Sequence, residues 1–208
     1  MTRIPSPLLV VTDRHQVHRP LEQVVAEAVS AGARWVWLRD RDLEVAERRR
    51  LALRLADILQ SAGGLLSIGG DIGLAAEIQA GAMHLPDVAG IAQARQALGA
   101  SVLVGMSAHS MVDVTSAQAA GADYVTLSPI HETTSKPGYG PALGIEAVRL
   151  AAKASIAIVG LGGISAENAA AVRDAGAAGV AIMGSVMRAT NPAQVVSDML
   201  SRLEPSSA

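Results

Sequence analysis

The sequence has 208 residues and a formal net charge of -2, and this length suits one domain with a large core better than two. It contains no cysteine, which excludes a disulfide framework and thiolate chemistry and leaves only His and carboxylate ligands for any zinc site. Hydrophobic residues make up 50% of the chain and aromatic residues only 2%, so aliphatic side chains must fill the interior.

Neither a membrane nor a nucleic-acid partner is indicated by the sequence. The first seven residues lack the apolar core of a signal peptide, and no apolar stretch reaches membrane-spanning length. The basic run Arg48-Arg49-Arg50 stands beside Glu44 and Glu47 in a helical pattern, which is typical of a solvated helix face rather than a nucleic-acid patch. We therefore expect a cytoplasmic protein that binds neither membrane nor nucleic acid.

Short apolar runs recur along the chain and alternate with helical patterns. The runs span residues 8–12, 35–38, 65–68, 82–85, 102–106, 124–127, 157–161 and 179–183. Helical spacing of apolar residues covers 21–30, 45–60, 91–98, 112–120, 145–154 and 166–175. Repeated strand–helix crossovers of this kind make a parallel sheet, and eight of them favour closure. We predict an α/β fold with one domain over residues 1–208, a (β/α)8 TIM barrel; a doubly wound open sheet is the alternative.

Four Ala-Gly-Ala triplets mark the places where a helix should end and a strand begin. Their glycines are Gly32, Gly81, Gly121 and Gly176, and we expect each to take the left-handed conformation that ends many helices. The remaining long loop, residues 133–144, leaves the end of the sixth strand. In a barrel that is the active-site face, so this loop is predicted to bind or cover a ligand.

Glycine-rich turns follow the seventh and eighth strands. Gly162 and Gly163 come after one, Gly184 and Ser185 after the other, and each turn leads into a helical segment. Backbone N–H groups at such turns bind anions, and barrels commonly hold a phosphate there. The alternative is that these are ordinary tight turns in which Ser165 and Ser185 cap helices.

Histidine and cationic residues also lie at predicted strand ends. His109 follows Ser107 at the end of the fifth strand and can exchange a proton near neutral pH, whereas His84 in an apolar strand is the weaker candidate. Arg39 and Arg41 close the second strand. With Lys136 of the long loop they could converge on anionic substrate groups; the alternative is surface ion pairing of the arginines with Asp40 and Asp42.

Together these motifs identify a resemblance that runs nearly end to end. The chain resembles the thiamine phosphate synthase/TenI family, whose members are barrel proteins of this size. The resemblance is carried by Val10-Val11-Thr12-Asp13, Trp37-Leu38-Arg39-Asp40-Arg41, Ala82-Met83-His84-Leu85-Pro86, Gly105-Met106-Ser107-Ala108-His109-Ser110, Gly121-Ala122-Asp123-Tyr124, Ser128-Pro129-Ile130, Thr134-Ser135-Lys136-Pro137 and Gly162-Gly163-Ile164.

The chain departs from the synthase pattern at the magnesium ligands. Synthases of this family carry Asn-Asp after the third strand and a second Asp after the fourth, where this chain has Gly69-Gly70 and Ala89. Trp37 stands where synthases usually have Gln. Asp71 and Asp87 lie close by in sequence and could substitute as ligands.

The resemblance to TenI-like proteins therefore implies a thiazole tautomerase, an isomerase that moves a proton on a carboxythiazole phosphate without a metal or other cofactor. His109 would carry the proton, Arg39, Arg41, Ser107 and Lys136 would bind substrate, and the two glycine turns would hold its phosphate. One alternative is a magnesium-dependent thiamine phosphate synthase, which joins hydroxymethylpyrimidine pyrophosphate to thiazole phosphate. Another is a regulator that binds a phosphorylated ligand without catalysis. The sequence leaves open whether the protein forms a homodimer.

Overall fold

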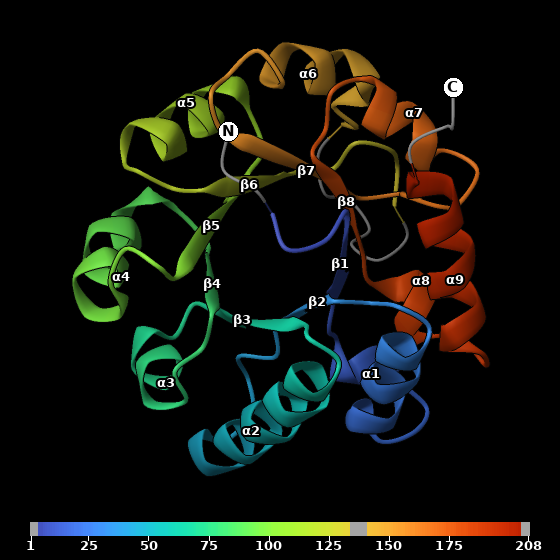
Figure 1. Ribbon diagram of the computed structural model, residues 1–208. Coiled ribbons are helices and arrows are strands. Elements are labelled where there is room, and N and C mark those ends of the chain that lie inside the picture. Colours follow the sequence, from blue (N-terminus) through green and yellow to red (C-terminus); the bar gives the residue numbers. More distant parts are fainter. Residues whose placement is uncertain (1–3, 134–140, 205–208) are drawn as a thin grey trace.

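The computed structural model describes residues 4–133 and 141–204, and their strands form one closed parallel barrel (Figure 1). Each strand pairs with its neighbours in sequence, and the first pairs with the last, which confirms the predicted barrel. The strands are β1 (Leu8–Val11), β2 (Trp35–Leu38), β3 (Leu65–Gly69), β4 (Ala82–Leu85), β5 (Leu103–Ala108), β6 (Tyr124–Leu127), β7 (Ala157–Leu161) and β8 (Gly179–Ile182).

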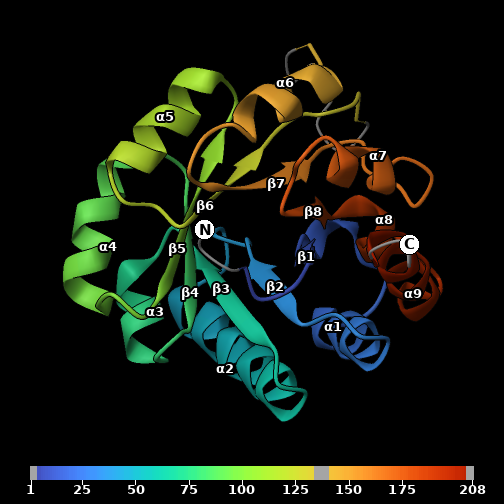
Figure 2. The ribbon, with the colours of Figure 1, turned by 45° about the horizontal axis from the view of Figure 1, so that its top comes forward.

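Helices surround the barrel as an outer layer (Figure 2). They are α1 (Leu21–Ser30), α2 (Val45–Ser61), α3 (Ile72–Glu77), α4 (Ile91–Leu98), α5 (Met111–Ala119), α6 (Gly144–Ala151), α7 (Ala169–Asp174), α8 (Gly184–Met187) and α9 (Pro192–Leu203), with 3-10 turns at Arg14–Gln16 and Val88–Gly90. Helices α3, α8 and α9 lie outside the helical ranges named above, and α8 is the helical segment expected at the Gly184 turn. Of the helices described, none is long and apolar enough to cross a membrane.

Side chains alternate along the strands between the helix layer and the barrel interior. The interior cluster contains Trp35, Trp37 and Tyr124, three of the four aromatic residues of the chain; the fourth, Tyr139, lies outside the described residues. Gly105 on β5 makes room for the Tyr124 ring, because a Cβ at Gly105 would collide with it. The aromatic side chains of the described residues are therefore concentrated in the barrel interior.

The glycines of the Ala-Gly-Ala triplets divide into two groups. Gly32, Gly121 and Gly176 have φ of +107°, +83° and +103°, as expected of glycine after a helix. Gly81 was wrongly predicted to do the same: the left-handed residue after α3 is Gln79, with φ of +52°. A Cβ at position 81 would collide with the end of the Leu65 side chain, which would have to move to admit a larger residue.

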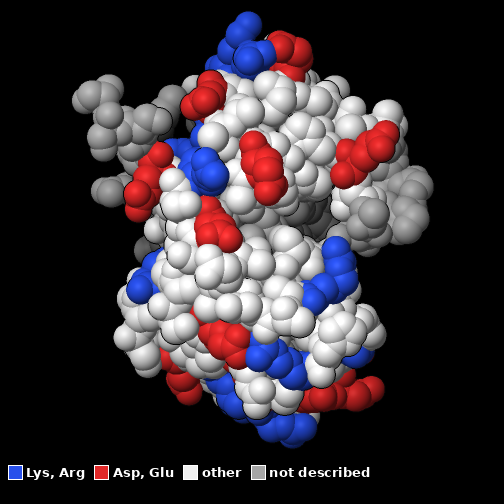
Figure 3. Space-filling model, turned by 90° about the vertical axis from the view of Figure 1, so that its right-hand side faces the viewer, with Lys and Arg blue, Asp and Glu red and all other residues white. Residues whose placement is uncertain are grey.

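The basic run in α2 is only partly a solvated face, so that interpretation was wrong for its first residue. Arg48 is 5% exposed. Its guanidinium donates to the carbonyl oxygens of Asp40 (2.9 Å) and Gly69 (2.7 Å) and pairs with Asp71 at 3.0 Å. Arg49 is exposed and pairs with Glu77. Acidic and basic residues are intermingled on the face shown in Figure 3.

Candidate active site

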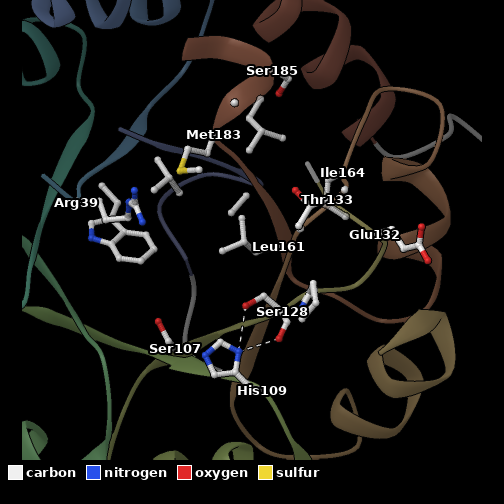
Figure 4. A pocket seen from close by; sticks show the side chains of 18 of the residues that line it. Arg39, Ser107, His109, Ser128, Glu132, Thr133, Leu161, Ile164, Met183 and Ser185 are labelled. Carbon is white, nitrogen blue, oxygen red and sulfur yellow. Dashed lines mark hydrogen bonds between the residues drawn. The ribbon is translucent and has the colours of Figure 1, made fainter. Parts of the chain in front are cut away.

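A cavity of about 370 Å³ opens at the C-terminal ends of the strands, within the size range of small-molecule sites. It brings together seven of the predicted site residues, of which Arg39, Ser107, His109 and Ser185 are labelled in Figure 4. The seven are Arg39, Ser107, His109, Gly162, Gly163, Gly184 and Ser185. Their convergence from β2, β5, β7 and β8 follows from the parallel barrel, in which all strands end at the same rim.

His109 stands directly after β5 and is held by its neighbours. Its backbone N–H donates to Asp113 at 2.8 Å, and its Nδ1 lies 2.8 Å from the carbonyl oxygen of Ser128. A carbonyl can only accept a hydrogen bond, so Nδ1 carries the proton of the neutral ring. The basic lone pair of His109 is then on Nε2, which is the arrangement that a general base requires.

The two glycine turns line the same side of the cavity. Gly162 and Gly163 have φ of +96° and +63°, and a Cβ on Gly163 would collide with the carbonyl of Glu132. Neither serine is the residue directly before its helix: the N-cap residues are Asn168 for α7 and Met183 for α8, and Ser185 lies within α8. The alternative that Ser165 and Ser185 act as N-caps is therefore wrong.

Arg39 reaches the cavity while pairing with Asp13, whose carboxylate lies 3.0 Å from its guanidinium. The expected surface partners, Asp40 and Asp42, have other contacts. Asp40 accepts from Thr12 at 2.6 Å, and Asp42 accepts from Arg14 and from His15. The hydrogen bond from His15 is the main cause that lowers the pKa of the Asp42 carboxyl.

The expected convergence of three cations is not what the described part of the chain shows. Arg41 lines a separate, open hollow with Arg48, Gly70 and Asp71. The reason is that β2 ends at Leu38, so the alternation that places Arg39 inward does not continue to Arg41. Lys136 lies outside the described residues.

Several residues of the cavity wall were missed by the sequence analysis, among them Ser128, Glu132 and Arg188. Arg188 lies four residues after Gly184, with its guanidinium against that glycine and hydrogen-bonded to Gln16. The spacing of one helical turn from a glycine-rich anion site was a signal that could have identified it. Arg188 adds a positive charge beside the β8 turn.

His84, the weaker histidine candidate, is completely buried beneath the cavity and does not line it. Its ring packs against Trp37 with a centroid separation of 3.8 Å. Burial, followed by the charge of Arg41, lowers the pKa of His84 to about 3. Below the cavity the imidazole is thus a neutral hydrogen-bonding group.

The residues between β2, β3 and β4 do not fit a magnesium site. Gly70 has φ of +67°, and a Cβ there would lie 2.6 Å from Cζ of Arg41. The Arg41 guanidinium therefore occupies the space that a side chain at position 70 would need. Ala89 offers no ligand atom. Asp71 caps α3 and pairs with Arg48, while Asp87 accepts from the backbone of Ala89. Both nearby carboxylates therefore have structural partners, and magnesium usually needs one or two available carboxylates.

A closed parallel barrel whose rim gathers a histidine, two arginines and two glycine turns is suited to bind a small anionic molecule. The model of the family described as thiamine monophosphate synthase, TMP-TENI, matches residues 8–186, and the chain belongs to this family. The resemblance noted in the sequence is thereby confirmed, and the protein is a barrel protein of thiamine biosynthesis.

Relatives and solved structures agree with this family. A putative thiamine-phosphate synthase of Geobacter sulfurreducens is 33% identical over 208 residues, covering 99% of this chain and 98% of that protein. A thiamine-phosphate synthase of Haloarcula marismortui is 35% identical over 89% of this chain and 90% of its own. The structure of thiamine phosphate pyrophosphorylase from Pyrococcus furiosus has a TM-score of 0.85, 24% identity and 95% coverage of both chains. At that identity it supports the fold.

Proposed function

We propose that this protein is a metal-independent thiazole tautomerase, an isomerase that converts a carboxythiazole phosphate with an exocyclic double bond into its aromatic isomer. The observation that carries the proposal is the rim beside β3, where the guanidinium of Arg41 lies in the direction that a carboxylate at position 70 would take. A reaction that displaces pyrophosphate needs a metal to neutralise the leaving group. A proton shift within one molecule has no leaving group and needs a base.

His109 is the proposed base and acid of this reaction. Its Nε2 takes a proton from the ring carbon, and the electron pair of that C–H bond forms a double bond within the ring. The electron pair of the exocyclic double bond then forms a new C–H bond at the exocyclic carbon, with the proton that the His109 imidazolium returns. The shift consumes no oxidant or co-reactant. The carbonyl of Ser128, 2.8 Å from Nδ1, orients the ring and stabilises its charged form.

The other cavity residues are proposed to hold the substrate. Backbone N–H groups of the turns at Gly163 and Gly184 bind the phosphate, supported by the charge of Arg188. Arg39 is the proposed partner of the carboxylate because it reaches the same cavity. Lys136 keeps its proposed role at the substrate, whereas Arg41 has no place in this scheme.

The second candidate function is thiamine phosphate synthase, a transferase. It is favoured by the names of the relatives, two of which are described above as synthases or putative synthases. In that case Asp71 and Asp87 would have to give up their present backbone and Arg48 contacts to bind magnesium.

One experiment separates the candidates. The purified protein is incubated with the exocyclic-alkene carboxythiazole phosphate, with and without EDTA, while ultraviolet absorbance reports formation of the aromatic ring. In parallel it receives hydroxymethylpyrimidine pyrophosphate, thiazole phosphate and magnesium. We expect aromatisation that EDTA leaves unchanged and that a His109→Asn variant lacks. Condensation that requires magnesium and matches or exceeds isomerisation would replace the proposal with the synthase, and binding without turnover would indicate a regulator.

A further inference from the structure

Polar side chains continue from the floor of the cavity into the barrel interior. Ser107 is half-buried and lines the cavity, where Figure 4 shows it at the end of β5 near His109. Beneath it, His84 and Ser67 are completely buried. Buried polar groups of this kind are costly unless each finds a hydrogen-bond partner, so each buried N–H or O–H group must have an acceptor.

Tyr124, His84 and Ser107, from three strands, form one continuous set of hydrogen bonds that joins the interior to the cavity. Deeper in the interior, the indole Nε1 of Trp35 donates to Oγ of Ser67 at 2.9 Å. The Tyr124 hydroxyl lies 3.1 Å from Nδ1 of His84. On the other side of the ring, Nε2 of His84 lies 3.1 Å from Oγ of Ser107.

The first member of this chain gives the hydrogen bonds a direction. The proton of the completely buried Tyr124 hydroxyl needs an acceptor. Among the residues described, the hydrogen-bond partner of that hydroxyl is Nδ1 of His84, so Tyr124 donates to Nδ1. The proton of the neutral His84 ring is consequently on Nε2, where it faces Ser107.

Both titratable members of the chain stay neutral near pH 7. Burial and the charge of Arg41 lower the pKa of His84 to about 3, and burial raises the pKa of the Tyr124 hydroxyl well above its usual range. A neutral imidazole has one N–H and one bare nitrogen. Each nitrogen of His84 therefore has a single hydrogen-bonding role, which leaves the direction of the chain unambiguous.

We infer that this buried chain makes the Ser107 hydroxyl a directed donor into the cavity and so determines which ligand atom can face it. Because the Ser107 oxygen accepts from His84, its own proton is left for the cavity. The matching ligand group is an acceptor: a carboxylate or carbonyl oxygen, or a bare ring nitrogen. Tyr124 and His84 are positioning residues that act through Ser107. The direction of the chain is independent of which reaction the protein catalyses.

The tautomer of His84 tests this inference without any ligand. Protein labelled with 15N-histidine is studied by two-bond proton–nitrogen correlation spectra, which distinguish protonated from bare imidazole nitrogens. We expect Ser107→Ala to shift the protonated nitrogen of His84 and Tyr124→Phe to shift the bare one. Thr126→Val is the matched control: its hydroxyl is a second, longer hydrogen-bond contact of Nε2 at 3.4 Å and does not line the cavity. Its removal leaves the Tyr124 and Ser107 contacts in place and should leave the tautomer unchanged.

The opposite assignment overturns the inference. If Ser107→Ala shifts the bare nitrogen, or if His84 is an imidazolium at pH 7, the Ser107 proton does not face the cavity. Should Tyr124→Phe fail to fold, Ser107→Ala alone still identifies the nitrogen that faces Ser107.

Calorimetric titration tests the consequence for binding, and this part rests on the proposed substrate. Ser107→Ala should weaken binding of the carboxythiazole phosphate roughly tenfold, the effect of one hydrogen bond, and leave binding of inorganic phosphate unchanged. Equal weakening of both would show a disturbed cavity and refute the donor role. Since the spectra need no substrate, an error in the proposed function would leave their result on the tautomer intact.

Discussion

Arg48 provides a direct test of how the rim beside β3 is held together. Replacing it with Leu keeps most of the apolar stem but removes the donors to the carbonyl oxygens of Asp40 and Gly69. An unsatisfied buried carbonyl costs about 1–3 kcal/mol. The Asp71 carboxylate is 43% exposed, so water replaces that contact at little cost. The open hollow beside Arg48 admits some water to the carbonyls as well, so we expect a loss of about 3 kcal/mol.

Urea and thermal denaturation measure this loss. For a domain of this length, 3 kcal/mol corresponds to a fall in Tm of about 6–12 °C. The matched control is Arg49→Leu, the neighbouring residue on the exposed face, whose pair with Glu77 should contribute less than about 1 kcal/mol. If both variants changed stability by the same small amount, Arg48 would be an ordinary surface residue and the reasoning would be wrong.

Three further predictions concern the cavity and the residue beneath it. His109→Ala should lower kcat about 100- to 10,000-fold in the absorbance assay with the circular dichroism spectrum unchanged; turnover near the normal rate would eliminate it as proton carrier. Gly163→Val should abolish phosphate binding in calorimetry, because a Cβ would meet the Glu132 carbonyl, whereas Ser185→Ala should have little effect. The pKa of His84 is about 3 in the folded protein, below its ordinary value in the unfolded chain. The unfolded chain therefore binds a proton first on acidification. The free energy of unfolding should fall by about 1.4 kcal/mol per pH unit from about pH 6.5 down to about pH 3. Urea titrations of His84→Gln should lack this slope.

The parts of the fold that the sequence predicts best are those determined by local pattern. Every strand was expected within a few residues, because buried parallel strands are short apolar runs with turn residues on either side. Helix α3 was missed since its six residues, with Gly73 in the first turn, have too little length for a helical period. The position of the cavity followed from the fold, as parallel strands bring Ser107, His109 and the glycine turns to one rim.

What the sequence could not predict depends on contacts between distant segments. The partners of Arg48 are Asp40 on the loop after β2, Gly69 at the end of β3 and Asp71 just before α3. Its charged neighbours in α2 therefore gave no indication of burial. The hydrogen bonds of His84 to Tyr124 and Ser107 join residues 40 and 23 positions apart. A histidine in an apolar strand gives the same sequence signal whether it is a neutral member of a buried chain or a group that exchanges protons.

The departures from the synthase pattern are coupled to one another by packing. The missing side chain at Gly69 leaves room for Trp37, whose Nε1 would lie 2.6 Å from a Cβ there, and Trp37 in turn packs on His84. At Gly70, the adjacent guanidinium of Arg41 also contributes to the low pKa of His84. A carboxylate introduced at position 70 alone would have to adopt φ of +67° and displace that guanidinium. Introducing a magnesium site at this position would therefore require changes at Arg41 as well as Gly70. Those changes would alter a charge that, after burial, contributes to the low pKa of His84.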